Sequence, residues 1–195
     1  MQRISLINIA HQHISDLLKS GDIAIDATLG NGHDAVFLMK LVAPSGQVFG
    51  FDIQQAAIAA TQTNSAGATG LTLIHASHAL MAENIPKQHH GHIKAIMFNL
   101  GYLPGGDKNI ITQTASTLRA LNAATALLAA EGIITIMAYP GHAGGDLETE
   151  QIERWCEQLD KSRFSYQLRY STVTSASAPR LFMLRKTHLF TDVTQ

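Results

Sequence analysis

The chain has 195 residues, 46% of them hydrophobic, and a formal net charge of −1 from 14 Lys and Arg against 15 Asp and Glu. This length predicts a single domain over residues 1–195, and the balanced charge excludes a protein that binds nucleic acid through a uniformly basic surface. No apolar run approaches the roughly 20 residues of a membrane span, and the Met1-Gln2-Arg3 start lacks a signal-peptide pattern, so we expect a cytoplasmic protein that does not enter a membrane.

The chain alternates apolar strand patterns with helical patterns. An opening helix is expected from Ile4 to Lys19, and strands are expected near residues 23–28, 47–51, 71–75, 93–99 and 132–138. Such alternation predicts a parallel sheet with helices on both faces. The clearest helix is expected from Asn109 to Ala130.

The tail departs from this alternation. Ser165 to Thr174 and Leu181 to Arg185 predict two strands with no helix between them, and therefore an antiparallel hairpin at the end of the sheet. The expected fold class is thus α/β: a Rossmann-like, mostly parallel seven-stranded sheet with helices on both faces and a C-terminal antiparallel hairpin. This arrangement is the one expected of a class I methyltransferase.

The run Asp26-Ala27-Thr28-Leu29-Gly30-Asn31-Gly32-His33-Asp34 places a glycine-rich turn between an apolar strand and a helix. Glycines there let the backbone approach a ligand closely. Gly30, Gly32 and Ala35 match the dinucleotide fingerprint formally. The carboxylate of Asp26 instead suits a ligand with a positive amino group and would repel a pyrophosphate. S-adenosylmethionine is such a ligand.

Further cofactor contacts follow from positions in this fold. Asp26 is expected to face the methionine amino group directly or through water, and Asp52, at the end of the next strand, to hold the ribose of any adenosine cofactor. The remaining expected cofactor-binding residues are Gly30, Asn31, Gly32, Asp34, Gln54, Ser77, His78 and Asn99. Two alternatives stay open: Gln54 reaches the adenosine or only caps the helix after it, and Asp34 binds the ligand or only stabilises the start of its helix.

A second candidate site is the run Phe98-Asn99-Leu100-Gly101-Tyr102-Leu103-Pro104-Gly105-Gly106-Asp107, which follows the predicted strand 93–99. The Asn99 side-chain oxygen can accept a hydrogen bond from an amine, and Tyr102 offers an aromatic face for a base. Methylases of exocyclic amines carry an Asn or Asp, two prolines and an aromatic residue here, whereas this chain has Leu100-Gly101 in the middle. The alternative is a glycine-rich turn whose Asn caps the following helix.

Three stretches of the chain closely resemble the small bacterial class I methyltransferases labelled rRNA methylases. They are residues 26–34, residues 50–54 and, most specifically, residues 98–108. The resemblance implies a methyltransferase that uses S-adenosylmethionine. Members of that family are assigned to the tRNA wobble position, where they methylate 5-aminomethyl-2-thiouridine to its methylaminomethyl form. The leading expected partner is therefore the anticodon region of tRNA with its wobble uridine, and rRNA N-methylation is the alternative within the same chemistry.

A neutral amine is required for methyl transfer, because a protonated amine has no lone pair. A primary alkylamine has a pKa near 10, by analogy with lysine, so the pocket must favour the free amine or remove a proton. The expected catalytic residues are Asn99, Tyr102 and His142. His142 and His33 are the candidate proton acceptors, and each of them could equally be a solvated loop histidine.

Basic residues concentrate near the C-terminus. Between Lys161 and Lys186 there are six Lys and Arg residues and no acidic residue, with aromatic residues among them. The candidate RNA-binding residues are Lys161, Arg163, Arg169 and Arg180. The alternative is that these side chains only blunt an exposed strand edge. A homodimer is the expected assembly, because pairing would widen the RNA-binding surface.

No metal site is expected, since His89, His90 and His92 lack the Cys or carboxylate partners of a structural site. One function from a different class stays open at this point: a non-catalytic dinucleotide-binding redox sensor, which the Gly30, Gly32 and Ala35 match favours.

Overall fold

The structure is a computed structural model and describes residues 5–66, 68–103, 105, 110–171 and 175–187. Its elements are α1 Leu6–Ser15, β1 Ile23–Asp26, α2 His33–Val42, β2 Gln47–Asp52, α3 Gln55–Asn64, β3 Leu71–His75, η1 His78–Leu80, α4 Met81–Asn84, η2 Lys87–His89, β4 Ile93–Asn99, α5 Thr114–Leu127, β5 Leu128–Ala138, α6 Gly145–Glu157, β6 Phe164–Tyr170 and β7 Arg180–Lys186.

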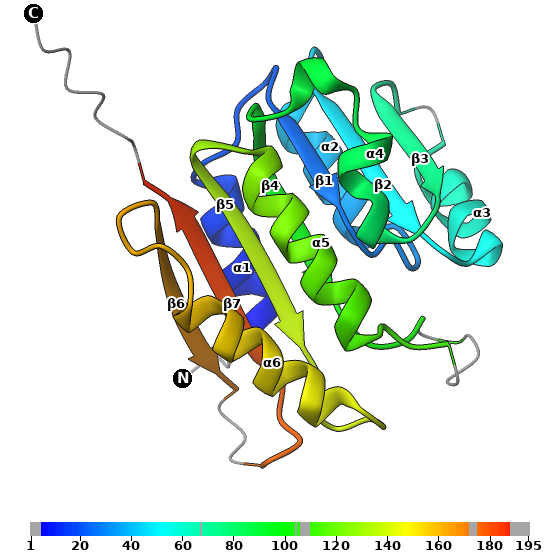
Figure 1. The fold of residues 1–195 in the computed structure, drawn as a ribbon. Helices are drawn as coiled ribbons and strands as arrows, with labels where there is room; N and C mark the ends of the chain where they lie inside the picture. The colour runs from blue at the N-terminus through cyan, green and yellow to red at the C-terminus, as the bar shows by residue number, and fades with distance from the viewer. Residues whose placement is uncertain (1–4, 67, 104, 106–109, 172–174, 188–195) are drawn as a thin grey trace, which may run out of the picture.

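The strands form one seven-stranded sheet in the order β3-β2-β1-β4-β5-β7-β6 (Figure 1). Strands β1 to β5 are parallel, and β7 pairs antiparallel with both β5 and β6. The predicted α/β class, the seven strands and the closing hairpin are therefore confirmed. Insertion of β7 between β5 and β6 also distinguishes this sheet from the six-stranded parallel sheet of a dinucleotide-binding domain.

Helices cover both faces of the sheet, which explains why the central strands are almost entirely apolar. In Figure 1, α4, α5 and α6 lie on the near face, while α1 and α2 lie behind the sheet. Side chains alternate between the two layers: Ile25 of β1 packs in the core with Leu121 of α5, and its neighbour Ala24 packs in the core with Leu38 of α2. No helix in the described part of the chain is long and apolar enough to cross a membrane.

Two predicted helices are longer than the observed ones. Helix α1 ends at Ser15 rather than Lys19, with Asp16 as its C-cap. Helix α5 ends at Leu127 because Leu128 takes an extended conformation and begins β5, whose first residues were predicted to be helical. Predicted boundaries at Ile4, Asn109 and Thr174 lie outside the described residues.

The sheet has two ends along the strand direction, and the candidate site residues gather at one of them. The carboxyl ends of the parallel strands all lie at the same end of the sheet, here called the carboxyl edge. Open α/β folds bind ligands at this end. Because β7 is antiparallel to both its neighbours, β6 runs in the same direction as β5. Tyr170 therefore lies at the carboxyl edge, whereas Phe164 lies at the opposite edge of the sheet.

Candidate active site

A cavity of about 750 Å³ opens at the carboxyl ends of β1, β2, β4 and β5. This volume is within the roughly 300–1,000 Å³ range of small-molecule sites. Eleven of the residues singled out from the sequence line it: Gly30, Asn31, His33, Asp34, Asp52, Gln54, Ser77, His78, Asn99, Tyr102 and His142. The structure thus brings together the glycine turn, the end of β2 and the loop after β4.

Helix α3 packs against the glycine turn and forms hydrogen bonds with it. Gly30 and Gly32 both have positive φ angles, of 50° and 79°. A Cβ atom on Gly32 would lie 2.7 Å from the side chain of Thr61, and the hydroxyl of Thr61 donates to the Gly30 carbonyl at 3.4 Å. The amide of Asn64 donates to the Asn31 carbonyl at 2.9 Å. Thr61 and Asn64 were missed by sequence reasoning, because nothing local marks a helix residue that contacts a distant turn.

Asp52 is held at the rim of the cavity by the backbone. Its two carboxylate oxygens accept hydrogen bonds from the N–H of Gly30 at 3.0 Å and the N–H of Gln54 at 2.9 Å. The carboxylate is therefore fixed before any ligand arrives and can still accept from a hydroxyl pair, as predicted for ribose. Gln54 occupies the N-cap position of α3, but its side chain makes no capping hydrogen bond to this helix.

Asp26 is fully buried and does not line the cavity, contrary to the prediction that it faces the ligand's amino group directly. It pairs with Gly50 and Met97, and β2 and β4 both continue two residues further, which encloses it. Its Oδ1 accepts from the N–H of Thr28 at 3.1 Å, and its Oδ2 has no partner within the described residues. Burial and the neighbouring Asp34 raise the pKa of Asp26 to about 8. Asp26 therefore supports the turn from beneath as an uncharged acid at neutral pH.

This raised pKa gives a testable pH dependence of stability. A folded-state pKa above the unfolded value of about 4 means that the contribution of Asp26 is fully favourable below pH 4 and is lost as pH rises toward 8. The slope from this group reaches at most about 1.4 kcal/mol per pH unit. The Asp26→Asn variant is expected to flatten the fall in unfolding free energy between pH 5 and 8, measured by urea denaturation. Parallel curves for the two proteins would show that Asp26 is ionised in the folded state.

Ser77 and His78, which are expected at the adenine edge, both line the cavity. The Ser77 hydroxyl accepts from the N–H of Ala79 at 3.2 Å and so fixes the start of η1. His78 is 8% exposed and stands edge-on to Phe98, with ring centroids 5.9 Å apart. Burial lowers the pKa of His78, although a backbone hydrogen bond with Ala27 and the Asp52 charge oppose this. The ring is thus neutral, and its buried Nε2 has no partner in the described part of the chain.

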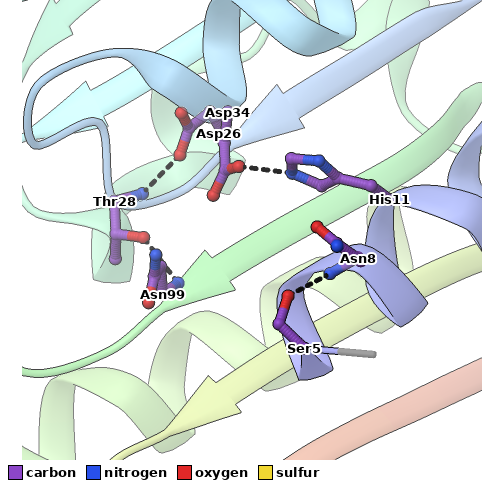
Figure 2. A network of polar contacts seen from close by, with 7 residues as sticks. All are labelled: Ser5, Asn8, His11, Asp26, Thr28, Asp34 and Asn99. Atoms are coloured by element: carbon purple, nitrogen blue, oxygen red, sulfur yellow. Dashed lines mark hydrogen bonds and ion pairs between the residues drawn. The ribbon is translucent and has the colours of Figure 1, made fainter. Parts of the chain in front are cut away.

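Asn99 ends β4 at the floor of the cavity. Its backbone N–H donates to the hydroxyl of Thr28 at 2.7 Å, which ties the end of β4 to the glycine turn (Figure 2). Within the described residues its side-chain amide makes no hydrogen bond. Helix α5 begins only at Thr114, with Gln113 in the N-cap position, so the alternative that Asn99 caps the following helix is wrong.

A buried carboxylate that the sequence did not reveal anchors the loop after β4. Glu148 of α6 is 2% exposed and accepts from the hydroxyls of Thr112 at 2.8 Å and Thr117 at 2.6 Å. Thr112 in turn exchanges hydrogen bonds with the backbone N–H and carbonyl of Gly101. Glu148 thereby fixes the two ends of the loop between β4 and α5. Pro104, Gly106, Asp107 and Lys108 of the predicted motif lie outside the described residues.

Tyr102 and His142 form one wall of the cavity. The Tyr102 ring is edge-on to the His142 ring, with centroids 6.4 Å apart at 79°, and Tyr102 is 42% exposed. Nδ1 of His142 donates to the Ala143 carbonyl at 3.1 Å, which leaves the lone pair of the neutral ring on Nε2. This Nε2 is buried beside Gly101 and Gly145 and lacks a partner in the described structure. His33, the other candidate proton acceptor, is an exposed residue of the rim.

The four basic candidates separate into two pairs. Arg169 and Arg180 lie at the carboxyl edge near the cavity, where Arg180 pairs with Glu153 at 3.2 Å and stands 5.8 Å from the Tyr170 ring centroid. Lys161 and Arg163 lie just before β6, about 20 Å away along this seven-residue strand. The prediction that all four share one RNA-facing edge is not supported, because sequence proximity in a hairpin does not specify which end of the sheet a residue reaches.

The histidines of the predicted solvated segment have separate partners. The His90 ring contacts the Ile85 carbonyl at 3.0 Å, and the His89 ring packs at a tilt against Phe49. Among the residues that the structure describes, no three His, Cys, Asp or Glu side chains gather in a way that could hold a metal ion.

The sheet order and the cavity at its carboxyl edge define the class I, S-adenosylmethionine-dependent methyltransferase fold. A family model described as "Putative rRNA methylase" matches residues 48–186, and the chain belongs to this family. This membership and the hairpin order remove the support for a dinucleotide-binding redox sensor.

Three relatives are informative. The chain is 38% identical over 165 residues to the chloroplastic tRNA (mnm(5)s(2)U34)-methyltransferase of Arabidopsis thaliana, covering 79% of this chain and 60% of that protein. A crystal structure from Clostridium thermocellum named "putative rRNA-methylase" is 36% identical with a TM-score of 0.89, covering 95% of this chain and all of that chain. A "putative methyltransferase" from Streptococcus mutans in complex with SAH is 32% identical with a TM-score of 0.83, covering 95% of this chain and 99% of that chain.

Proposed function

We propose that this protein transfers a methyl group from S-adenosylmethionine to the primary amine of 5-aminomethyl-2-thiouridine at the wobble position of tRNA. The observation that carries the proposal is the 38% identity to a plant protein named for that tRNA position. The chain spans 60% of the length of that relative. The product would be 5-methylaminomethyl-2-thiouridine.

Three features of the cavity support binding of the cofactor. Asp52 presents a fixed carboxylate for the ribose hydroxyls, and the glycine turn presents backbone that approaches within reach of a methionyl chain. His78, which lines the cavity at the position expected for the adenine edge, has a buried Nε2 with no partner among the described residues. When bound, the cofactor supplies an electrophilic sulfonium methyl group.

The loop after β4 would orient the amine. The Asn99 side-chain oxygen can accept a hydrogen bond from the amine N–H, which aligns the nitrogen lone pair toward the methyl group. The exposed Tyr102 ring offers a face on which the thiouracil ring can stack. The lone pair on Nε2 of His142 is the proposed acceptor of the amine proton, reached by a small rotation of the ring away from Gly101.

Loss of the Asn99 side chain is expected to affect chemistry more than cofactor binding. The Asn99→Ala variant should reduce kcat about tenfold or more, the effect of one hydrogen bond that orients the amine, while affinity for S-adenosylhomocysteine changes little. The readout is single-turnover methylation of tRNA together with calorimetry. An unchanged kcat would show that Asn99 does not contact the amine.

Exposed aromatic and basic side chains at the carboxyl edge also support RNA binding. Within the described residues, the exposed large hydrophobic side chains all lie along this edge: Ile53, Tyr102, Ile110, Leu147 and Tyr170. Arg169 and Arg180 lie beside them at the end of the β6–β7 hairpin. Aromatic faces next to arginines are the usual elements of single-stranded nucleic-acid recognition, and tRNA exposes unpaired bases in its anticodon loop.

The separation of the basic residues provides a matched test of this interface. Arg169→Ala is expected to weaken tRNA binding about three- to tenfold at low salt and to reduce its salt dependence by about one phosphate contact. Arg163→Ala removes the same charge immediately before the start of that strand, at its far end, and should leave both unchanged. Filter binding at several salt concentrations measures the effect. Equal losses in the two variants would place the RNA elsewhere.

Cells that lack this protein provide the test of the substrate. Nucleoside mass spectrometry of their tRNA should show accumulation of 5-aminomethyl-2-thiouridine and loss of the methylaminomethyl form. The family description favours rRNA as a second candidate. An unchanged tRNA profile with a missing methyl group in ribosomal RNA would assign the protein to rRNA instead.

A further inference from the structure

The acid that faces the cavity at the glycine turn is Asp34, not Asp26. Asp34 lies in the first turn of α2, is 8% exposed and lines the cavity. Its Oδ1 contacts Nε2 of His11 at 2.7 Å, and its Oδ2 makes no hydrogen bond within the described residues. Oδ1 of Asp34 is therefore held by His11, and Oδ2 can accept a hydrogen bond from a ligand in the cavity.

His11 comes from a part of the chain that is remote from the predicted motifs. It lies on α1, and its ring stacks on Phe37 with centroids 3.8 Å apart and an interplanar angle of 8°. Phe37 follows Asp34 by one turn of α2, so the stacking and the hydrogen bond fix His11 against the same helix face. Figure 2 shows the His11 ring reaching across to the carboxylate from the side opposite the glycine turn.

The neighbouring acids do not compete for this position. Asp26 is enclosed beneath the turn, and both oxygens of Asp52 are already engaged by backbone N–H groups at the other side of the cavity. A carboxylate at a helix N-terminus, next to glycine backbone, suits the zwitterionic end of an amino acid, because the ammonium can meet the acid and the carboxylate can meet backbone N–H groups.

We propose that Asp34 accepts the ammonium of the cofactor's amino-acid end and that His11 is the positioning residue that holds Asp34 toward the cavity. This inference rests on the proposed function, since it assigns a part of the same cofactor site. It assigns a role to α1, which the sequence motifs did not include in the site.

The test compares two ligands that differ in the amino-acid end. S-adenosylhomocysteine has the ammonium, and 5′-deoxy-5′-methylthioadenosine lacks it. By calorimetry, Asp34→Asn should bind S-adenosylhomocysteine at least about tenfold more weakly, and His11→Ala about three- to tenfold more weakly, as expected for a charged and an ordinary hydrogen bond. Both variants should bind methylthioadenosine within about twofold of the wild type.

Controls separate positioning from general loosening of the fold. His13→Ala, on the same helix, should bind both ligands like the wild type, and His11→Gln, which retains a hydrogen-bond donor, should recover part of the lost affinity. Equal weakening of both ligands in His11→Ala, or no weakening of either, would overturn the proposal. A wild-type protein that binds neither ligand would instead overturn the cofactor assignment itself.

Discussion

Replacing Gly32 with Ala is expected to lower the free energy of unfolding by about 4 kcal/mol, from strain at a positive φ and from overpacking. Gly32 has φ 79°, which is costly for any residue with a Cβ. The new Cβ would also lie 2.7 Å from two atoms of the Thr61 side chain. Thr61 is fully buried and cannot move aside.

Gly144 provides the matched control for this prediction. It is the N-cap of α6 with the same φ of 79°, and a Cβ there meets nothing within 4 Å. Gly144→Ala should therefore cost only the backbone strain, about 1–2 kcal/mol. The difference between the two variants in urea denaturation isolates the contact with Thr61, and Gly32→Ala combined with Thr61→Ala should regain part of it. Equal costs at Gly32 and Gly144 would contradict the close approach of α3 to the turn.

Replacing Asp52 with Ala is expected to reduce affinity for S-adenosylhomocysteine at least about 100-fold. Two hydrogen bonds from ribose hydroxyls to a carboxylate contribute about 1.5–3 kcal/mol each. The substitution also removes the acceptor for the Gly30 and Gln54 N–H groups, so the turn itself loses an anchor. Calorimetry at constant salt measures the combined loss.

A ribose-modified ligand separates these two effects of Asp52. The wild type should prefer S-adenosylhomocysteine over its 2′-deoxy analogue by about tenfold, the value of one charge-assisted hydrogen bond. Asp52→Ala should bind both equally weakly, because the group that detects the hydroxyl is gone. A preserved preference in this variant would mean that another residue recognises the ribose.

The fold could be predicted from the sequence because its signals are local. A strand that is buried on both faces must be apolar throughout, and a glycine turn between such a strand and a helix specifies the βα unit. The absence of a helical pattern between residues 165 and 185 predicted the antiparallel hairpin. The same local signals placed Asp52, Ser77 and Asn99 at the ends of their strands, and these residues do line the cavity.

The remaining parts of the site depend on contacts between distant segments. Asp26 and Asp34 flank one turn, and the burial of Asp26 is decided by how far β2 and β4 extend beyond β1. Glu148 is fixed by threonines 31 and 36 residues away, and His11 by an acid 23 residues away. Lys161 and Arg169 are close in sequence but lie at opposite ends of β6. Pairings of this kind have no periodic or motif signal in a single chain.

The most direct measurement of the central claim is methyl transfer by the purified protein to tRNA isolated from cells that lack it. With deuterated S-adenosylmethionine, mass spectrometry should show the label in 5-methylaminomethyl-2-thiouridine, with matching loss of 5-aminomethyl-2-thiouridine and strongly reduced transfer by Asp52→Ala. Absence of label in that nucleoside, in tRNA shown to contain its aminomethyl precursor, would contradict the proposed function.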